Sequence, residues 1–176
     1  MVSDLKKMTT DFMEAVNYLN GGEGQKNIPN TGRLLPSLLN LMSIISLPEL
    51  NLLIKMPDIT RYPLLRDNIL LKLLQFRDNF KNFTGRYQFE TRDRHFLMSA
   101  VFDNGRIMVA MKNIDRPHIK VIFRDDNALR NFIFAPKPDI LGAVLTQDVV
   151  LEGNLNYIYK FAYMAKHLQL IVTGKI

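Results

Sequence analysis

The chain has 176 residues, which is enough for one globular domain, or for a compact domain with a helical extension. Hydrophobic residues make up 47% and charged residues 23%, so the chain can bury a core and is not of the disordered class. It contains no cysteine, which excludes disulfides, thiolate metal ligands and cysteine nucleophiles. The net charge of +6 favours anionic partners, but the basic residues are scattered, so a solvated basic surface is the simpler interpretation.

The first part of the chain is predicted to be helical, because its apolar residues recur every three or four positions. Residues 34–54 are apolar enough to suggest a membrane span, but prolines and polar side chains interrupt the run, and two short helices are the better interpretation. The predicted helices cover residues 3–19, 36–46, 48–55 and 63–83. The start of the chain lacks the basic-then-apolar run of a secretory signal, and we expect a cytoplasmic protein.

The pattern changes at Gly85 from a helical period to the period of two that is typical of strands. Asn104-Gly105, between two apolar runs, predicts a tight hairpin. The predicted strands are residues 86–91, 96–102, 107–111, 118–123 and 148–153, and the predicted helices are 125–133, 138–145 and 154–168. Short loops at the start and helices gathered towards the end indicate an α+β fold, with a helical extension over residues 1–83 and a domain over 84–176.

Three segments of this second part carry a family resemblance. They are residues 121–129, which end a strand and begin an acid-capped helix, residues 138–141, and residues 149–161 with the junction Glu152-Gly153-Asn154. In this order the segments resemble the sterol-carrier-protein-type-2-like family, over about residues 84–168. The resemblance implies a five-stranded antiparallel sheet covered by helices, with an apolar tunnel that holds a sterol, fatty acid, acyl-CoA or phospholipid.

Methionine and phenylalanine are frequent in the segments that would wall such a tunnel, and methionine adapts well to irregular apolar partners. The candidate lining residues are Phe89, Phe96, Met98, Met108, Phe132, Leu141, Tyr157, Phe161 and Met164. A solidly packed core is the alternative interpretation of the same residues. The predicted function is therefore non-enzymatic binding or carriage of a long-chain apolar ligand, and the alternative is an interaction or assembly module whose helical N-terminal part binds another subunit.

Catalytic and cofactor chemistry find little support in the sequence. The three histidines have no metal-ligand spacing, and no nucleophile elbow or phosphate-binding loop occurs, so neither an enzyme nor a cofactor is expected. Asp125-Asp126 is interpreted as a helix cap. Residues 92–95 (Arg-Asp-Arg-His) are interpreted as a solvated turn, with contact to a phosphate headgroup as the alternative. The expected partner is a lipid-like ligand, with peripheral contact to an anionic membrane and a homodimer left open, and without nucleic acid.

The strands at residues 96–102 and 107–111 carry apolar side chains on both faces. A sheet with one solvated face should alternate apolar with polar residues. We therefore expect both faces to be covered, one by the C-terminal helices and the other by residues 36–55 and 63–83, which dock on the domain, on the same chain or across a dimer, and form one unit with it.

Overall fold

The computed structural model describes residues 33–48, 69–135 and 139–176, together with five isolated helical and exposed positions. These positions are Ser3, Lys7, Thr10, Asp11 and Glu14. Apart from them, the predicted helix over residues 3–19 lies outside the described residues. The predicted helix over residues 48–55, beyond its first residue, also lies outside them, as do residues 63–68 of the next one.

The described elements follow the predicted order. The strands are β1 (Thr84–Thr91), β2 (Leu97–Asp103), β3 (Arg106–Ala110), β4 (Ile119–Phe123) and β5 (Val149–Gly153). The helices are α2 (Leu34–Ser46), α4 (Ile69–Phe76), the 3₁₀ helix η4 (Arg77–Asn79), α5 (Asp126–Phe134), α6 (Ile140–Leu145) and α7 (Leu155–Val172). The helix predicted over residues 63–83 ends earlier, in η4, and the α+β class is confirmed.

The five strands form one mixed sheet in the order β3-β2-β1-β4-β5. Neighbours are antiparallel except β1 and β4, which are parallel, so the expectation of a wholly antiparallel sheet is wrong at this pair. The cause is the connection over residues 111–118, which leaves the end of β3 and returns the chain to the start of β1. Gln88 Oε1 accepts from Ile114 N at 3.1 Å, and His118 N donates to Arg86 O at 2.8 Å, so the connection crosses one face of β1.

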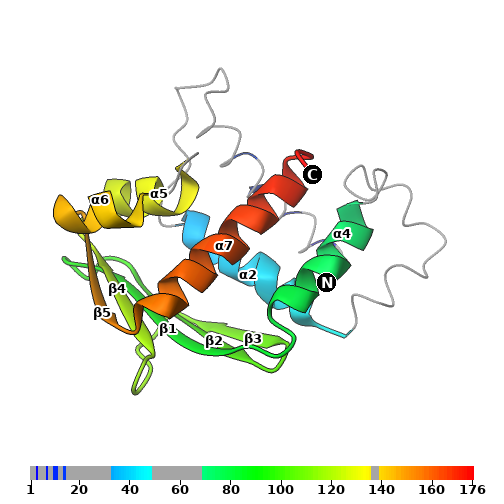
Figure 1. Cartoon of the computed structure of the whole chain (residues 1–176), viewed down its shortest axis with the longest axis horizontal. Coiled ribbons are helices and arrows are strands. Elements are labelled where there is room, and N and C mark those ends of the chain that lie inside the picture. The colour runs from blue at the N-terminus through cyan, green and yellow to red at the C-terminus, as the bar shows by residue number, and fades with distance from the viewer. Residues whose placement is uncertain are drawn as a thin grey trace.

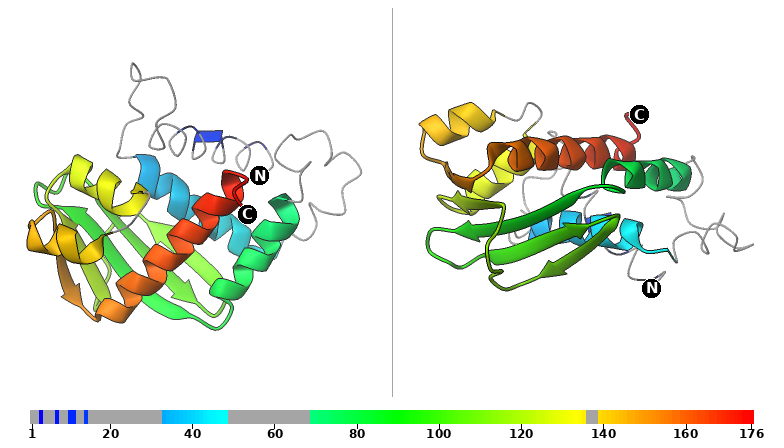
Figure 2. Two further views of the ribbon diagram at one scale, coloured as in Figure 1. Left: turned by 45° about the horizontal axis from the view of Figure 1, so that its top comes forward. Right: turned by 60° about the horizontal axis from the view of Figure 1, so that its bottom comes forward.

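All described helices lie on the other face of the sheet (Figures 1 and 2). Helix α7 runs across that face, where the ring of Phe161 lies 5.0 Å from Phe89 and 5.5 Å from Tyr87. Helix α4 packs on α7, and its Phe76 reaches Phe80 at 5.6 Å between ring centroids. Residues of α2, α4, α7 and the sheet belong to a single hydrophobic core.

Helix α2 seals the outer edge of the sheet at β3. Ser43 Oγ donates to Ile107 O at 2.7 Å, and Ser46 Oγ accepts from Ile107 N at 3.2 Å. An exposed strand edge invites pairing with another chain, and here two serine hydroxyls take the place of a neighbouring strand. Within the described parts of the chain, no helix is both long and apolar enough to cross a membrane.

Within the described residues, neither α2 nor α4 covers the second face of the sheet. The described parts of residues 36–55 and 63–83 are α2 and α4, and both lie on the side of α7 (Figure 2). The connection over residues 111–118 crosses the second face instead, and Met108 beside it is 59% exposed. Helices α2 and α4 do share one core with the sheet, as expected, but on the face that α7 covers, and residues 49–55 and 63–68 of the same predicted segments lie outside the described residues.

Candidate ligand-binding groove

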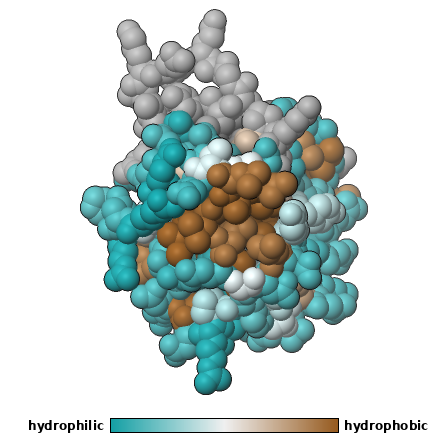
Figure 3. Space-filling model, turned by 60° about the vertical axis from the view of Figure 1, so that its left-hand side comes forward, coloured by the Kyte–Doolittle hydropathy of each residue, from teal (hydrophilic) through white to brown (hydrophobic). Residues whose placement is uncertain are grey.

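A contiguous set of apolar side chains is exposed where α6, β5 and the start of α7 meet. Figure 3 shows an apolar patch on this side of the molecule. Its exposed members are Leu141, Val144, Leu145, Val150, Leu155, Tyr159 and Tyr163. Leu141 is 66% and Leu145 74% exposed, and contiguous exposure of this kind marks binding surfaces.

The patch contains a groove in two parts. The first, of about 520 Å³, is lined by Arg92, Ile140, Leu141, Val144, Gln147, Val149, Val150, Leu151, Leu155 and Tyr159. The second, of about 450 Å³, is lined by Asp139, Ile140, Leu141, Tyr159, Ala162, Tyr163 and Lys166. Because Ile140, Leu141 and Tyr159 line both parts, the two parts adjoin one another between α6 and α7. Each volume lies in the usual range of small-molecule sites, about 300–1,000 Å³.

Helix α6 forms one wall of the groove and is held at both ends by local hydrogen bonds. Asp139 caps its start by accepting from Gly142 N at 2.7 Å. At its end, Thr146 Oγ1 donates to Gly142 O or to Asp148 Oδ2, each at 3.0 Å. The six residues of α6 are all apolar, and none of them is buried. The caps therefore fix a short helix whose apolar side chains remain open to a ligand.

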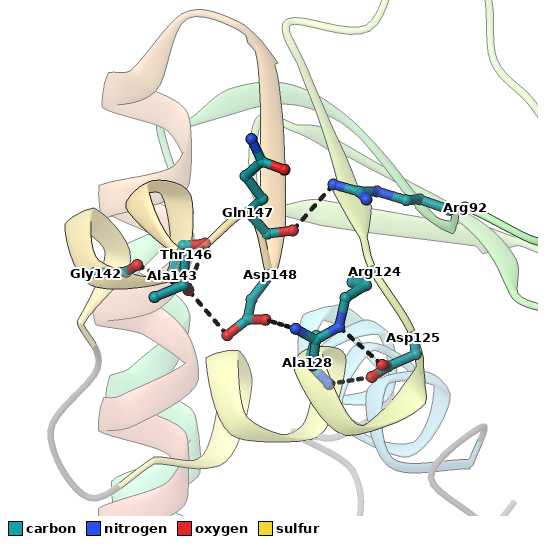
Figure 4. A network of polar contacts seen from close by, with 9 residues as sticks. All are labelled: Arg92, Arg124, Asp125, Ala128, Gly142, Ala143, Thr146, Gln147 and Asp148. Carbon is teal, nitrogen blue, oxygen red and sulfur yellow. Dashed lines mark hydrogen bonds and ion pairs between the residues drawn. The ribbon is translucent and has the colours of Figure 1, made fainter.

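A polar network next to the groove joins the ends of β4, α5, α6 and β5 (Figure 4). Arg124 Nε bonds Asp125 Oδ2 at 3.0 Å, and its Nη1 bonds Asp148 Oδ1 at 2.5 Å. The hydrogen bond with Asp125, followed by the charge of Asp148, raises the pKa of Arg124. The pKa of Asp125 is lowered, first by the N–H of Ala128 and then by Arg124, and the predicted cap of α5 is confirmed. The network holds the end of α6 next to the ends of β4 and β5.

Arg92 lines the first part of the groove and not the second. Its Nη2 donates to the carbonyl oxygen of Gln147 at 3.0 Å, and its backbone N donates to Phe123 O at 2.9 Å. Gln147 has a φ of 59°, in the left-handed region that non-glycine residues rarely adopt. Arg92 is the charged residue of an otherwise uncharged lining in this part of the groove.

The predicted lining residues are divided among four environments. Leu141 lines the groove, and Met108 lies on the opposite face of the sheet. Tyr157 is half-buried, with its carbonyl accepting from the hydroxyl of Tyr87 at 2.9 Å and its ring 4.6 Å from that of His118. The remaining six are buried in the core, namely Phe89, Phe96, Met98, Phe132, Phe161 and Met164. Whether these six also contact a ligand stays a prediction.

The sequence interpretation missed most of the groove lining, including Val144, Leu155 and Tyr159, while Arg92 was considered only for contact with a phosphate headgroup. One signal was available. Residues 140–145 contain no polar side chain, although a short helix on the surface of a sheet domain should carry a polar face. Among the described residues, no group of three histidine, aspartate or glutamate side chains is placed to hold a metal ion.

No protein-family model matches this sequence, and no curated protein matches it. Among solved structures, a ubiquinone synthesis protein titled UbiJ-SCP2 is similar at 11% identity and a TM-score of 0.45, over 55% of this chain and 75% of that one. A conserved hypothetical protein of Thermus thermophilus, whose title suggests a sterol carrier protein, is similar at 14% identity and a TM-score of 0.37, over 57% and 76%. Both titles name the type of domain that residues 84–168 resemble.

A third similar structure is the inverting sec-alkylsulfatase Pisa1 from Pseudomonas sp., at 14% identity and a TM-score of 0.45. It is matched over 61% of this chain, but this chain spans only 17% of that protein. The described part of the chain is an α+β domain with an open apolar groove at α6. What the groove binds has to be judged from its own residues.

Proposed function

We propose that this protein binds and carries a long-chain apolar ligand in the groove between α6, β5 and α7, without performing chemistry on it. The observation that carries the proposal is the open, two-part apolar groove around Leu141, held in place by caps at both ends of α6. The resemblance of residues 84–168 to sterol-carrier domains supports the same ligand class.

The energetics of burial are sufficient for such a ligand. Each methylene that leaves water contributes about 0.8 kcal/mol, so a chain of a dozen methylenes gains on the order of 10 kcal/mol before ordering costs. The protein gains too, because a ligand in the groove covers Leu141, Tyr159 and their neighbours, which are otherwise exposed. An apolar chain is therefore a better occupant than a polar molecule of the same size.

Binding without catalysis is supported by the chemistry of the lining. The described groove residues with charged side chains are Arg92, Asp139 and Lys166. Asp139 is engaged as the cap of α6, and Lys166 Nζ donates to Gln169 Oε1 at 3.1 Å. General acid–base or nucleophilic catalysis needs a reactive group in hydrogen-bond reach of a base, and this lining provides no such pair.

The assembly alternative has less support. It requires apolar surface on the N-terminal helices that is free for another subunit. In α2 the apolar side chains Leu35, Leu38 and Ile45 are fully buried, so this helix already serves the core of its own chain.

The test compares matched leucine variants. Leu141→Asp places a carboxylate in the groove, while Leu71→Asp alters a leucine of α4 that is 55% exposed and does not line the groove. The purified proteins are denatured and extracted, and co-purified lipid is measured by mass spectrometry, followed by titration with dodecanol. We expect L141D to lower lipid content and dodecanol affinity at least about tenfold, and L71D to change neither. Wild-type protein that yields no lipid and binds no dodecanol contradicts the proposal.

A further inference from the structure

Arg92 is positioned to hold the head of a ligand whose chain fills the groove. Its guanidinium lines the first part of the groove, where the other lining side chains are apolar apart from the amide of Gln147 and the phenol of Tyr159. A lone charge beside an apolar channel is suited to an amphipathic molecule with one charged end.

Among the described residues, no carboxylate pairs with Arg92, although carboxylates do pair with its neighbours. Arg124 binds the two carboxylates of Asp125 and Asp148, and Lys120 binds Glu90 at 2.9 Å. The described partner of the Arg92 side chain is instead a neutral carbonyl, that of Gln147. This bond orients the guanidinium through one Nη and leaves its charge and its other N–H groups for an acceptor in the groove.

The acid next to Arg92 in the sequence, Asp93, is bound within its own turn. Asp93 Oδ1 accepts from Thr91 Oγ1 at 2.6 Å and from His95 N at 3.1 Å, and its Oδ2 lies 3.2 Å from His95 Nδ1. The hydrogen bond from Thr91 is the main cause that lowers the pKa of Asp93, which therefore stays ionised and engaged in its own turn.

The two ends of the groove differ in charge. At the α6–α7 end, the lining includes both Asp139 and Lys166, whose charges are opposite. At the Arg92 end, the cation has no acidic counterpart in the lining. This difference gives a bound amphipath a direction, with its head at Arg92 and its chain towards Tyr163.

We infer that Arg92 selects ligands with an anionic head, a carboxylate or a phosphate monoester, over neutral ligands of the same chain length. This inference rests on the proposed function, because it assigns a polarity to the ligand of the same groove. A planar guanidinium binds either oxyanion through two parallel N–H···O bonds, so the two heads share one recognition chemistry.

The experiment measures dissociation constants of dodecanoate, dodecyl phosphate and dodecanol below their micelle concentrations by isothermal titration calorimetry. The full-length wild type is compared with Arg92→Gln, Arg92→Lys and Arg94→Gln. Arg94 lies in the same turn and does not line the groove, so R94Q controls for net charge. Thermal melts establish that each variant is folded.

In the wild type we expect both anions to bind about tenfold more tightly than dodecanol, since a charge-assisted hydrogen bond is stronger than a neutral one. R92Q should lose the preference for anions, with its dodecanol affinity unchanged. R92K should keep part of the preference, and R94Q should keep all of it. A preference confined to one of the two anions identifies the head as carboxylate or phosphate and still supports the inference.

Equal binding of dodecanol and both anions by the wild type overturns the inference and leaves the proposed function standing. An equal loss of preference in R94Q and R92Q also overturns it, because the effect is then one of net charge. If the wild type binds none of the three chains, it is the proposed function that fails.

Discussion

The junction between β5 and α7 predicts a large difference between two glycine substitutions. Gly153 has a φ of +118°, and a Cβ built on it lies 2.3 Å from the carbonyl oxygen of His118. Gly174, just after α7, has a φ of +66°, and a Cβ there has nothing within 4 Å. At both positions an alanine would be strained by the positive φ. Only in Gly153→Ala would the new Cβ also clash with another segment, at the carbonyl of His118.

The magnitudes follow from these two contributions. A non-glycine residue at positive φ costs about 1–2 kcal/mol, which is the whole expected cost of Gly174→Ala. In Gly153→Ala the His118 carbonyl must also move, and this carbonyl accepts from Asn154 N at 2.9 Å. Adding the strain and the lost hydrogen bond gives a total of about 3 kcal/mol, or a fall in Tm of roughly 6–12 °C for a chain of this length.

The assay is urea denaturation followed by far-ultraviolet circular dichroism, because the chain contains no tryptophan to report by fluorescence. The two variants are compared with the wild type in the midpoint and slope of unfolding. If G153A and G174A lose the same stability, within about 0.5 kcal/mol, the close approach at Gly153 does not limit the fold and the reasoning is refuted.

Three further predictions use the same denaturation assay. Ser46→Ala leaves the buried N–H of Ile107 without its acceptor and should cost about 1–3 kcal/mol, while Ser37→Ala on the same helix should cost less than about 0.5. Burial raises the pKa of Tyr87 above its ordinary value, so the unfolded chain loses this proton first. Stability should therefore fall as the pH rises above about 10, and less steeply in Tyr87→Phe. Asp125→Ala should cost about 1 kcal/mol at neutral pH, through loss of the helix cap. The lowered pKa of Asp125 makes its contribution present above its unfolded pKa and lost as the pH falls through the folded value, so equal acid sensitivity in D125A would contradict this.

The elements of the domain could be predicted because each carries its own local signal. Asp125 accepts from the backbone of the helix it was expected to cap. Asn104 and Gly105 both have positive φ, at 43° and 89°, as a two-residue hairpin between β2 and β3 requires. Such signals depend on a few neighbouring residues and do not change with the long-range pairing of the chain.

The pairing of β1 with β4 could not be predicted in the same way. Thirty or so positions separate Phe89 from its partner Val121, and the choice depends on where residues 111–118 cross. The loop sequence does not encode that path in any short motif. Strand pairing also decides which face of the sheet a side chain lies on. Met98 and Met108 were equivalent candidates in the sequence, but the register places Met98 in the core and Met108 on the opposite face.

The groove was predicted least well, because the sequence interpretation favoured large apolar residues and only Leu141 among them lines it. In a folded domain such residues are the first to be buried by the protein itself, as Phe89 and Phe161 are. A ligand site is left to apolar residues that the core does not use. Here these are the side chains of a helix too short to bury its own surface.

Apolar side chains are also exposed on the open face of the sheet, but that face is a poorer ligand site than the groove at α6. The buried side chains in its middle are polar. Gln88 Nε2 donates to Met98 O at 3.2 Å, Ser99 Oγ donates to Ala110 O at 3.2 Å, and Glu90 is paired with Lys120. An apolar chain laid across this face would remove water from the Lys120–Glu90 pair without replacing its hydration, which costs free energy. Between α6 and α7 the chain meets apolar side chains on both walls and a cation only at one end, so the ligand is expected at α6 and not on the sheet.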